Sequence, residues 1–534
     1  MLTACRRYSF LLLFGWLPAS RAASFNFSSA FGDACGGTAN MQKETDCTGH
    51  DRSGIFLVVL AAYFLLHVFV RVLLSGSLEL DEAEQVFAFQ QPRLGYGTQP
   101  PLYAWLQWLI FSVFGVNLFA LAALKNLLLF ATCLGMFHLA RPMIGVRGAM
   151  AVSASLLLLP AIGWESQIDR SHSVLLVCLA CATLWCYFAL LRHPLTTRYA
   201  LFGLLVGMGM QSKYNFLIFI AGLATASLLT AEHRLILWNR RAWVAVAIAL
   251  LCVLPHGFWL VNHLDEASKG TLHKISMGDQ HAGYLRDVAG GLRRMLVAAA
   301  AFITPLWLVY GLISRPYWKQ ATIERRNPDA RFFIRLYLAF LAWMMALLLS
   351  AEVGTIQSRW MLPLLFSLPL AFFVVLPGLA RNAVFQRLLH VAAFAAILIL
   401  LTIALRVYLG PTLGRYVRVH HPYWQLSAEL ASRFPQARTI IADDTLVAGN
   451  LYFQRPAVRT LTLDEVLQAS ARPEGPLLLV VRDGTHAGRI ARFRAACPRC
   501  SMQQYGRLDL RYGGGGEVMS FHYALVCCKC RGAA

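Results

Sequence analysis

Apolar stretches of about 20 residues recur along this chain, and they limit the folds that it can adopt. The first that could cross a lipid bilayer as an α-helix runs from Gly54 to Leu74. Hydrophobic residues make up 57% of the chain and charged residues only 14%, well below the charged fraction of about 25% in soluble domains. The sequence therefore predicts an all-α polytopic membrane domain.

We place this domain at residues 54–409 and expect about 11 to 13 transmembrane helices in it. The spans are predicted near 54–75, 118–140, 147–163, 172–192, 198–211, 214–231, 242–262, 294–314, 332–351, 359–379 and 387–409. Residues 101–117 form a further apolar helix that either spans the bilayer or lies at its interface.

Basic residues lie mainly in short connections between the predicted spans, and they set the expected orientation. These connections, at 141–147, 192–198, 234–241, 315–331 and 381–387, all fall on one side of the predicted alternation. Short loops rich in Lys and Arg face the cytoplasm. The net charge of +21 therefore reflects orientation, and no nucleic-acid partner is expected. The acidic segment at Asp81, the turn at Asp169 and the tail after residue 410 are then outside.

The N-terminal segment, residues 1–53, has two interpretations. The stretch "MLTACRRYSFLLLFGWLPASRAASF" has the charged start, short apolar core and small-residue site of a secretory signal. Cleavage there would invert every later span, against the pattern of basic loops. The alternative is that translation starts at Met41 and that residues 1–40 are a mis-called extension.

The tail, residues 410–534, is predicted to form a small soluble α/β domain. The stretches "RTIIADD", "LLLVVRD" and "EVMSFHYALV" are typical of buried or half-buried strands. The stretch "TLDEVLQASA" predicts a helix with Thr462 as N-cap and Glu465 at the capping-box position. Cysteines at positions 497, 500, 527, 528 and 530 could form disulfides, remain thiols or bind zinc, and the sequence leaves these alternatives open.

Polar residues at the outside ends of membrane helices are costly to keep against lipid, so they are candidate functional residues. The first group is Asp81 and Glu82, which begin the predicted amphipathic helix "DEAEQVFAFQ". A carboxylate at a membrane surface can act as a general base on a hydroxyl group. The alternative is the ordinary preference of helix N-termini for acidic residues.

Two further groups lie in predicted outside turns. Gln99 and Tyr103 flank a Pro-Pro pair that fixes an extended entry and then begins a helix, and a simple loop breaker is the alternative. Asp169 and His172 occupy a very short turn between apolar helices. There, a surface ion pair between Asp169 and Arg170 is the alternative.

Cationic residues complete the candidate set. Lys213 and Tyr214 interrupt the apolar stretch 201–229 at the outside edge. The compact charge of Lys suits a phosphate, and snorkelling toward headgroups is the alternative. Arg359 lies at the same depth, and His281 lies in the long outside loop. All these residues fall on one side in a topology that was derived without them.

The order of these groups resembles that of the integral-membrane glycosyltransferases of the GT-C class. The chain has Asp-Glu after its first membrane helix, Pro-Pro before the next apolar helix, an outside Asp, a Lys before the sixth span and "RWMLP" late in the membrane domain. More narrowly, residues 54–409 resemble the bacterial relatives of protein O-mannosyltransferases and the aminoarabinose transferase of lipid A. The tail stretch "RTIIADDTLVAGNLYFQR" is similar to the periplasmic domain of the latter.

The resemblance implies transfer of a sugar from a polyprenyl-phosphate donor to a lipid, glycan or protein acceptor, usually with inversion. It also implies a bacterial inner-membrane protein whose active site and tail domain are periplasmic. By position, Asp81 would be the catalytic carboxylate, Glu82 a supporting one and Asp169 a substrate-positioning one. Lys213 and Arg359 would hold the donor phosphate. The other substrate-binding candidates are Gln99, Tyr103, His172, Tyr214 and His281.

The chain departs from this pattern where Thr98 and Gln99 replace the Glu-Lys of the aminoarabinose relative. One metal ligand and one phosphate cation are therefore absent, although His281 falls where that relative has a metal-ligating His. A divalent metal is doubtful, and no cofactor or metal site is assigned. The alternative function is a transporter or flippase of lipid-linked sugars, which predicts internal repeats that this sequence lacks. The sequence does not identify the donor sugar or the acceptor.

Overall fold

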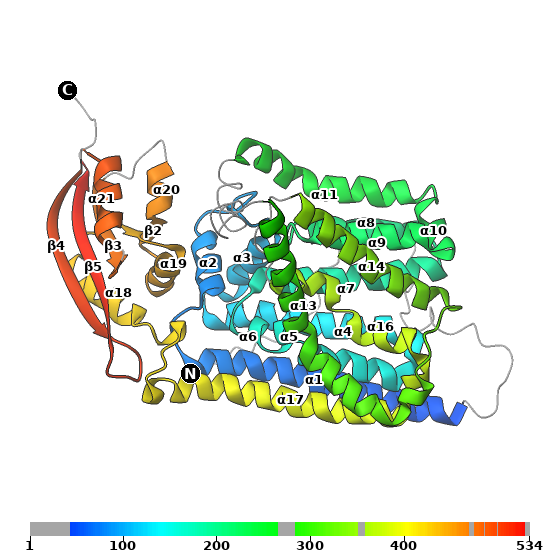
Figure 1. Cartoon of the computed structure of the whole chain (residues 1–534). Helices are drawn as coiled ribbons and strands as arrows, with labels where there is room; N and C mark the ends of the chain where they lie inside the picture. Colours follow the sequence, from blue (N-terminus) through cyan, green and yellow to red (C-terminus); the bar gives the residue numbers. More distant parts are fainter. Residues whose placement is uncertain are drawn as a thin grey trace, which may run out of the picture. The chain divides into compact units, whose positions relative to one another are not determined.

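The structure is a computed structural model that describes residues 43–264, 284–350, 358–468, 475–484, 486–498 and 500–528. The described residues up to Leu409 are mainly helical, and those beyond it form both helices and strands (Figure 1). The helices of the first part are α1 (Lys43–Leu74), α2 (Leu80–Phe89), α3 (Leu102–Phe114), α4 (Leu118–Ser155), α5 (Pro160–Gly163), α6 (Glu165–Ile168), α7 (Ser171–Arg192), α8 (Thr196–Met210), α9 (Phe216–Leu229), α10 (Ala231–Leu237), α11 (Ala242–Asn262), α13 (Tyr284–Ser314), α14 (Pro328–Leu349), α15 (Leu362–Leu365), α16 (Leu368–Val375) and α17 (Asn382–Leu409).

Seven helices within the described ranges are long and apolar enough to cross a membrane. They cover Arg52–Leu74, Leu118–Leu158, Ser171–Arg192, Ala242–Asn262, Val288–Gln320, Pro328–Leu349 and Asn382–Leu409. The sequence predicts more spans because it counts shorter helices such as α8 and α9, and because α4 covers two predicted spans. In α4 the backbone leaves the helical conformation at Gly145, where φ is 73°. The polytopic, all-α character of this domain is confirmed.

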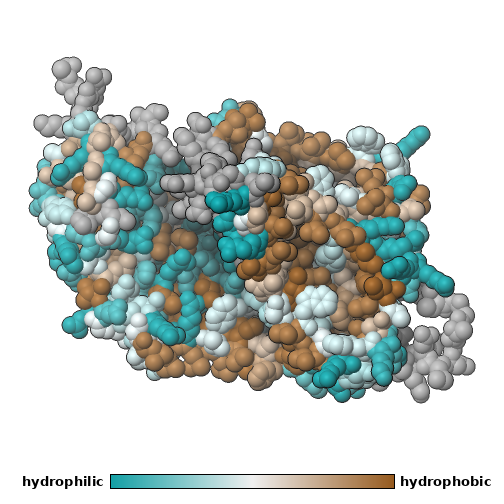
Figure 2. All heavy atoms as spheres, in the orientation of Figure 1, coloured by the Kyte–Doolittle hydropathy of each residue, from teal (hydrophilic) through white to brown (hydrophobic). Residues whose placement is uncertain are grey.

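Large apolar side chains are exposed on the outer surfaces of these helices. Trp243 is 75% exposed and Phe258 is 74% exposed. Figure 2 shows apolar residues gathered over the helical region, whereas the tail is largely polar. Apolar surface on this scale is incompatible with a water-soluble monomer. The chain is therefore a multi-span membrane protein.

Helix α7 lies at the centre of the helical domain and carries the site at its first turn. It is the most buried of the seven candidate spans, since 72% of its most apolar stretch is buried inside the protein. It packs against α4 and α8. A helix that is mostly buried among close-packed neighbours has little freedom to tilt or slide. Groups bound to its N-terminus are therefore held on a rigid base.

The tail contains a five-stranded sheet in the order β2-β1-β3-β5-β4 (Figure 1). Its elements are α18 (Tyr423–Arg433), β1 (Thr439–Ala442), α19 (Thr445–Gln454), β2 (Arg459–Thr462), α20 (Leu463–Gln468), β3 (Gly475–Arg482), α21 (His486–Ala496), β4 (Cys500–Arg511) and β5 (Val518–Cys528). Strands β2, β1 and β3 are parallel, and β5 and β4 continue the sheet antiparallel. The predicted small α/β domain is confirmed.

Strands β1 and β3 have continuous apolar sequences because alternate residues are buried on opposite faces of the sheet. Ile440 and Leu478 pack in the cluster that contains α18 and α19, whereas Ile441 and Leu477 pack in the cluster that contains α20 and α21. Strands buried on both faces lose the polar alternation of half-buried strands.

The local predictions for the tail can be compared with these elements. The three predicted strands correspond to β1, β3 and β5. The capping box at α20 is confirmed, because the Glu465 N–H donates to Thr462 Oγ1 at 3.3 Å and the Thr462 N–H donates to Glu465 Oε2 at 3.1 Å. The sequence did not predict β2 and β4, which are the two edge strands and carry more polar residues. Of the open alternatives for the cysteines, a disulfide bond is present at Cys500.

The tail is fastened to α2 by helix α19, and residues 52–534 form one compact unit. The Leu78 N–H donates to Asn450 Oδ1 at 2.8 Å in a buried contact. A Cβ on Gly449 would lie 2.2 Å from the Ala83 carbonyl oxygen, so the close approach of the two helices requires glycine there. The predicted boundaries at 53/54 and 409/410 stay predictions, and residues 1–42 lie outside the described part of the chain.

Candidate active site

Asp81 joins the first turn of α2 to the first turn of α7. Its Oδ2 accepts a hydrogen bond from the Ser171 N–H at 2.6 Å, and its own N–H donates to Asp169 Oδ1 at 2.9 Å. The first N–H groups of a helix have no partner within the helix and carry positive partial charge. Asp81 therefore serves as the acceptor at the start of α7, and this contact keeps its carboxylate beside Asp169.

Glu82 is buried and paired with Arg71 at the end of α1. The guanidinium donates from Nε to Oε1 at 2.9 Å and from Nη2 to Oε2 at 2.6 Å. Although burial alone would raise the pKa of Glu82, the charge and hydrogen bonds of Arg71 lower it to about 2. A carboxylate bound in this way positions α2 against α1. A supporting role for Glu82 in catalysis stays a prediction. Its contacts with Arg71 favour a role in holding α2, and with it Asp81, in position.

Glu79 and Asp169 have pKa values raised to about 7. For both, burial is the largest cause, and the next is the charge of a neighbouring carboxylate: Glu82 for Glu79, and Asp81 for Asp169. A proton therefore binds near neutral pH among carboxylates that lie side by side, as is common where acid–base chemistry occurs.

Arg418 brings a cation from the tail to this acidic group. Its Nη1 lies 3.0 Å from Asp169 Oδ2 and 3.8 Å from Glu79 Oε2. The adjoining backbone is fixed because Ser75 Oγ donates to the Val419 carbonyl at 2.5 Å and Ser77 Oγ to the His421 carbonyl at 2.7 Å. Arg418 could not be predicted as a site residue from the sequence, because a tail arginine gives no local signal of a contact so distant in the sequence.

Lys213 reaches the same first turn of α7 that binds Asp81. Its Nζ donates to Ser173 Oγ at 2.9 Å, two residues after Ser171. The predicted carboxylate and the predicted phosphate cation, 132 residues apart in the numbering, therefore converge on one helix terminus. A compact ammonium group and a helix N-terminus together favour binding of an anion.

Tyr214 supports the neighbouring loop. Its hydroxyl forms a 3.1 Å hydrogen bond with His256 Nε2 of α11, and His256 Nδ1 lies 2.8 Å from the Leu94 carbonyl oxygen. That loop continues to Gln99, whose backbone pairs with Tyr96 through two 3.1 Å hydrogen bonds. The Gln99 side chain is half-buried, and its role in substrate binding stays a prediction.

Tyr103 and His172 are buried beside Ser171 and Gln85. Tyr103 is 1% exposed and forms a side-chain hydrogen bond with Ser171, and its ring lies 5.4 Å from the imidazole of His172. His172 Nε2 lies 3.3 Å from Gln85 Nε2 on α2. Both predicted residues are thus packed between α2, α3 and α7, and a role of either one in substrate binding stays a prediction.

Arg359 and Arg170 are the remaining cations near Asp81. Burial and the charge of Arg170 lower the pKa of Arg359, while Asp81, Glu84 and Asp169 raise it. Arg170 is the one residue other than glycine with positive φ in the described ranges, at 75°. Its Nη2 lies 3.0 Å from Glu165 Oε2, so Arg170 pairs with Glu165 and does not form the surface ion pair with Asp169.

Lys125 is a buried cation that is not among the residues predicted from the sequence. It is 2% exposed in α4, and its Nζ donates to the Gln167 carbonyl at 3.3 Å. Its charge acts on both Glu82 and Asp169. An ionisable residue inside an apolar helix is a functional candidate by itself, and that signal was present in the sequence.

No group of three or more His, Cys, Asp or Glu side chains is arranged to hold a metal ion within the described residues. His281, the position that the resemblance associates with a metal, lies outside them.

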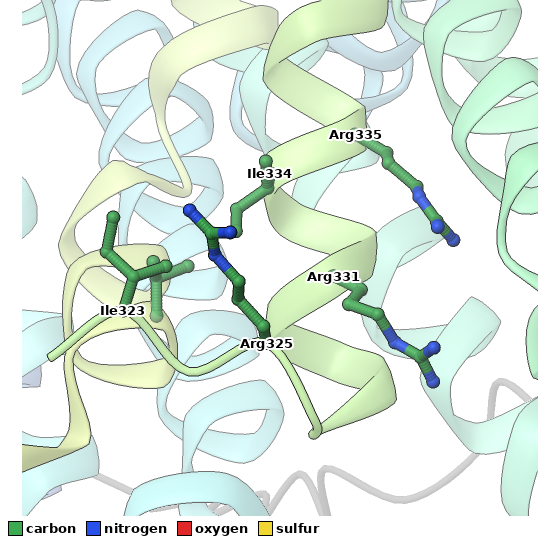
Figure 3. A pocket seen from close by; sticks show the side chains of 6 residues that line it. Ile323, Arg325, Arg331, Ile334 and Arg335 are labelled. Carbon is green, nitrogen blue, oxygen red and sulfur yellow. The ribbon is translucent and has the colours of Figure 1, made fainter.

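A separate pocket lies at the start of α14, and none of the predicted site residues lines it. Its volume is about 420 Å³, and its lining residues are Ile323, Arg325, Arg331, Ile334, Arg335 and Val375. Figure 3 shows Arg331 and Arg335 projecting to the same side of α14. The opposite end of α14 precedes Arg359, and a helix of 22 residues is about 33 Å long, so this pocket is remote from the acidic group.

Comparison with known proteins agrees with this arrangement. Residues 98–259 match the model of the dolichyl-phosphate-mannose-protein mannosyltransferase family. The chain is 34% identical over 497 residues to the lipopolysaccharide core galacturonosyltransferase RgtB of Rhizobium johnstonii, covering 90% of this chain and 99% of that protein. It is 33% identical to the lipopolysaccharide core galacturonosyltransferase RgtA of the same organism, covering 88% of this chain and 96% of that protein.

Solved structures show the same fold at low sequence identity. The crystal structure of ArnT from Cupriavidus metallidurans bound to undecaprenyl phosphate superposes with a TM-score of 0.56 at 13% identity, covering 87% of this chain and 97% of that one. The apo structure of ArnT gives a TM-score of 0.58. With the identity to RgtA and RgtB over nearly the whole chain, these findings establish that the protein is a membrane glycosyltransferase that belongs to the family of the lipopolysaccharide core galacturonosyltransferases.

Proposed function

We propose that this enzyme transfers a uronic acid from a polyprenyl-phosphate donor to lipopolysaccharide, with inversion, at the periplasmic face of the bacterial inner membrane. The observation that carries the proposal is the convergence of Asp81 and Lys213 on the first turn of α7. A general base and a phosphate-binding cation are the two groups that such a transfer needs beside one sugar.

In the proposed reaction, an acceptor hydroxyl oxygen attacks C1 of the donor sugar. The new C1–O bond forms as the bond between C1 and the phosphate oxygen breaks, and its electrons leave with the polyprenyl phosphate. Asp81 accepts the proton of the attacking hydroxyl. Lys213 and Arg359 stabilise the charge that develops on the departing phosphate. Asp169, through its contact with the Asp81 N–H, positions the base and the sugar.

The other candidates have supporting roles in this proposal. Gln99 and Tyr214 shape the loop that closes over the donor, and Tyr103 and His172 hold α7 in place. Glu82 acts by positioning α2 through Arg71. The relatives' names support the uronic acid and the lipopolysaccharide acceptor, and the undecaprenyl phosphate bound to ArnT supports a lipid-linked donor.

The orientation rests on the distribution of charge. Basic residues lie in the connections 141–147, 192–198, 234–241, 315–331 and 381–387, and helix alternation puts these connections at the ends opposite the acidic group. Because basic connections stay in the cytoplasm, the acidic group and the tail at 410–534 are assigned to the periplasm.

The test is reconstituted transfer. Purified protein in lipid vesicles is given polyprenyl-phosphate galacturonate and lipopolysaccharide from a strain that lacks the enzyme, and the product is analysed by mass. The proposal predicts the addition of one uronic acid residue by the wild type and little addition by Asp81→Asn. A wild type that transfers only a neutral sugar would contradict the choice of donor. A wild type that transfers no sugar from any polyprenyl-phosphate donor would contradict the mechanism.

A further inference from the structure

Two arginines beside Asp81 have buried N–H groups without a hydrogen-bond partner. Among the described residues, these atoms are Nη1 of Arg170 and Nε of Arg359. The two guanidinium groups are close enough for the charge of Arg170 to act on Arg359. Buried donors without acceptors cost free energy, and neighbouring like charges add to that cost. An anion bound at this point would offset both.

The backbone at Arg170 adds a second observation. Its φ of 75° and ψ of 37° lie in the left-handed region, which is uncommon for a side chain of this kind. This conformation lets one short turn present Asp169 and Arg170 immediately before Ser171, whose N–H binds Asp81. Strained conformations of this sort persist where the surrounding structure and function require them.

Glu165 holds the Arg170 guanidinium without using all of its donors. The ion pair uses Nη2, at 3.0 Å from Glu165 Oε2, and leaves Nη1 without a partner. An arginine that is oriented on one edge by a carboxylate can bind a second carboxylate through its remaining donors.

A donor uronic acid carries two anions, the phosphate on C1 and the carboxylate on C5, which flank the ring oxygen. The proposed function assigns the phosphate to Lys213 and Arg359, so the second anion needs a further cation. Arg418 already contacts Asp169 and Glu79 through Nη1, and Lys125 is buried on the Gln167 carbonyl. Of the cations near Asp81 that are not assigned to the phosphate, Arg170 is the one with a buried donor that has no partner among the described residues.

We propose that Arg170 is a specificity-determining residue that binds the C5 carboxylate of the donor sugar and selects uronic acids over neutral hexoses. This inference rests on the proposed function, since it takes the donor to be a polyprenyl-phosphate uronate.

The experiment compares two donors that differ only in that group, polyprenyl-phosphate galacturonate and polyprenyl-phosphate galactose. Each is assayed with the wild type, Arg170→Asn, Arg170→Lys and Lys213→Gln. Asparagine is chosen because it tolerates the left-handed backbone and removes the cation. Arg415→Gln, at an exposed position in the same tail segment as Arg418, is the matched control. Inhibition by galacturonate 1-phosphate and by galactose 1-phosphate is measured in parallel. The ratio of the two inhibition constants gives the preference for the uronate even if the enzyme does not transfer galactose.

The proposal predicts that Arg170→Asn lowers kcat/KM for the uronate donor by about 10- to 100-fold and leaves the neutral donor nearly unchanged. Inhibition by galacturonate 1-phosphate weakens by the same factor, and Arg170→Lys recovers part of the loss. Lys213→Gln weakens both sugars equally, because both carry the phosphate. Arg415→Gln changes neither.

Equal losses for both sugars in Arg170→Asn would overturn the proposal and assign Arg170 to the phosphate or to the fold. Undiminished preference for the uronate in that variant would overturn it as well. Failure of the proposed function looks different: the wild type itself would not transfer the uronate, whether it transferred galactose alone or neither sugar.

Discussion

Replacing Asp81 by Asn tests the proposed base with little change of shape. Asparagine keeps an oxygen that can accept the Ser171 N–H, which now lies 2.6 Å from Asp81 Oδ2. The bond changes from a charge-assisted one, worth about 1.5 to 3 kcal/mol, to a neutral one of about 0.5 to 1.5 kcal/mol. We therefore expect the free energy of unfolding to fall by only about 1 kcal/mol.

The rate of transfer should fall much more. A positioned general base contributes roughly 10²- to 10⁴-fold, which corresponds to about 3 to 5 kcal/mol of transition-state stabilisation. Since Lys213 and Arg359 are unchanged, the KM for the donor should stay within about twofold while kcat falls. Removing the Asp81 charge also removes one cause of the raised pKa of Asp169, so any residual activity should persist to lower pH.

The assay is initial-rate transfer by purified protein in vesicles, together with thermal unfolding of the same samples. Glu429→Gln is the control, because Glu429 is an exposed tail carboxylate whose ion pair is with Arg433 four residues later. A variant of Asp81 that keeps kcat within about twofold of the wild type would refute its role as the base. A loss of stability of several kcal/mol would show that the carboxylate is needed for the fold instead.

Three further results are expected. Arg71→Ala leaves Glu82 buried without its partner and should lower the free energy of unfolding by about 3 to 5 kcal/mol, measured by denaturant titration in detergent, and a loss below about 1 kcal/mol would show that the pair is dispensable. Burial and the neighbouring base raise the pKa of Asp169 from 3.8 to about 7. Between these two pH values the folded protein binds a proton at Asp169 that the unfolded chain has released, so this contribution to stability is lost as pH rises from about 4 to about 7. Because transfer needs the ionised carboxylates, kcat/KM should rise through about pH 7. A flat pH–rate profile between pH 5 and 8, or one that falls, would contradict this assignment. Gly449→Ala would push α19 away from the Ala83 carbonyl, 2.2 Å from the added Cβ, and should lower transfer and speed proteolysis between the membrane helices and the tail. Wild-type proteolysis and activity would show that the tail does not hold α2 in place.

Much of the site could be predicted because helix alternation decides which loop ends meet. Asp81, Asp169 and Lys213 were predicted to lie at the same end of the apolar helices, and their convergence on α7 follows from that placement. These residues could be selected as candidates because charge at a membrane edge is costly without a function, and their functional roles stay predictions.

The parts that the sequence did not reveal depend on contacts between distant segments. Arg418 reaches Asp169 only because the tail docks on α2, and no local pattern encodes that docking. The sequence does not distinguish the role of Glu82 from that of Asp81. Only the position of Arg71 in the structure shows that Glu82 is the carboxylate with an arginine partner. Strand β4 was missed because an edge strand with one solvated face carries the polar residues that also mark loops.

The most direct test of the central claim is an experimental structure of the enzyme with a polyprenyl-phosphate uronate, obtained with Asp81→Asn so that the donor stays intact. The account predicts the phosphate on Lys213 and Arg359, with C1 of the sugar facing residue 81 at the first turn of α7. A donor bound elsewhere, for example at the pocket of Arg325, Arg331 and Arg335, with the first turn of α7 left empty, would contradict it.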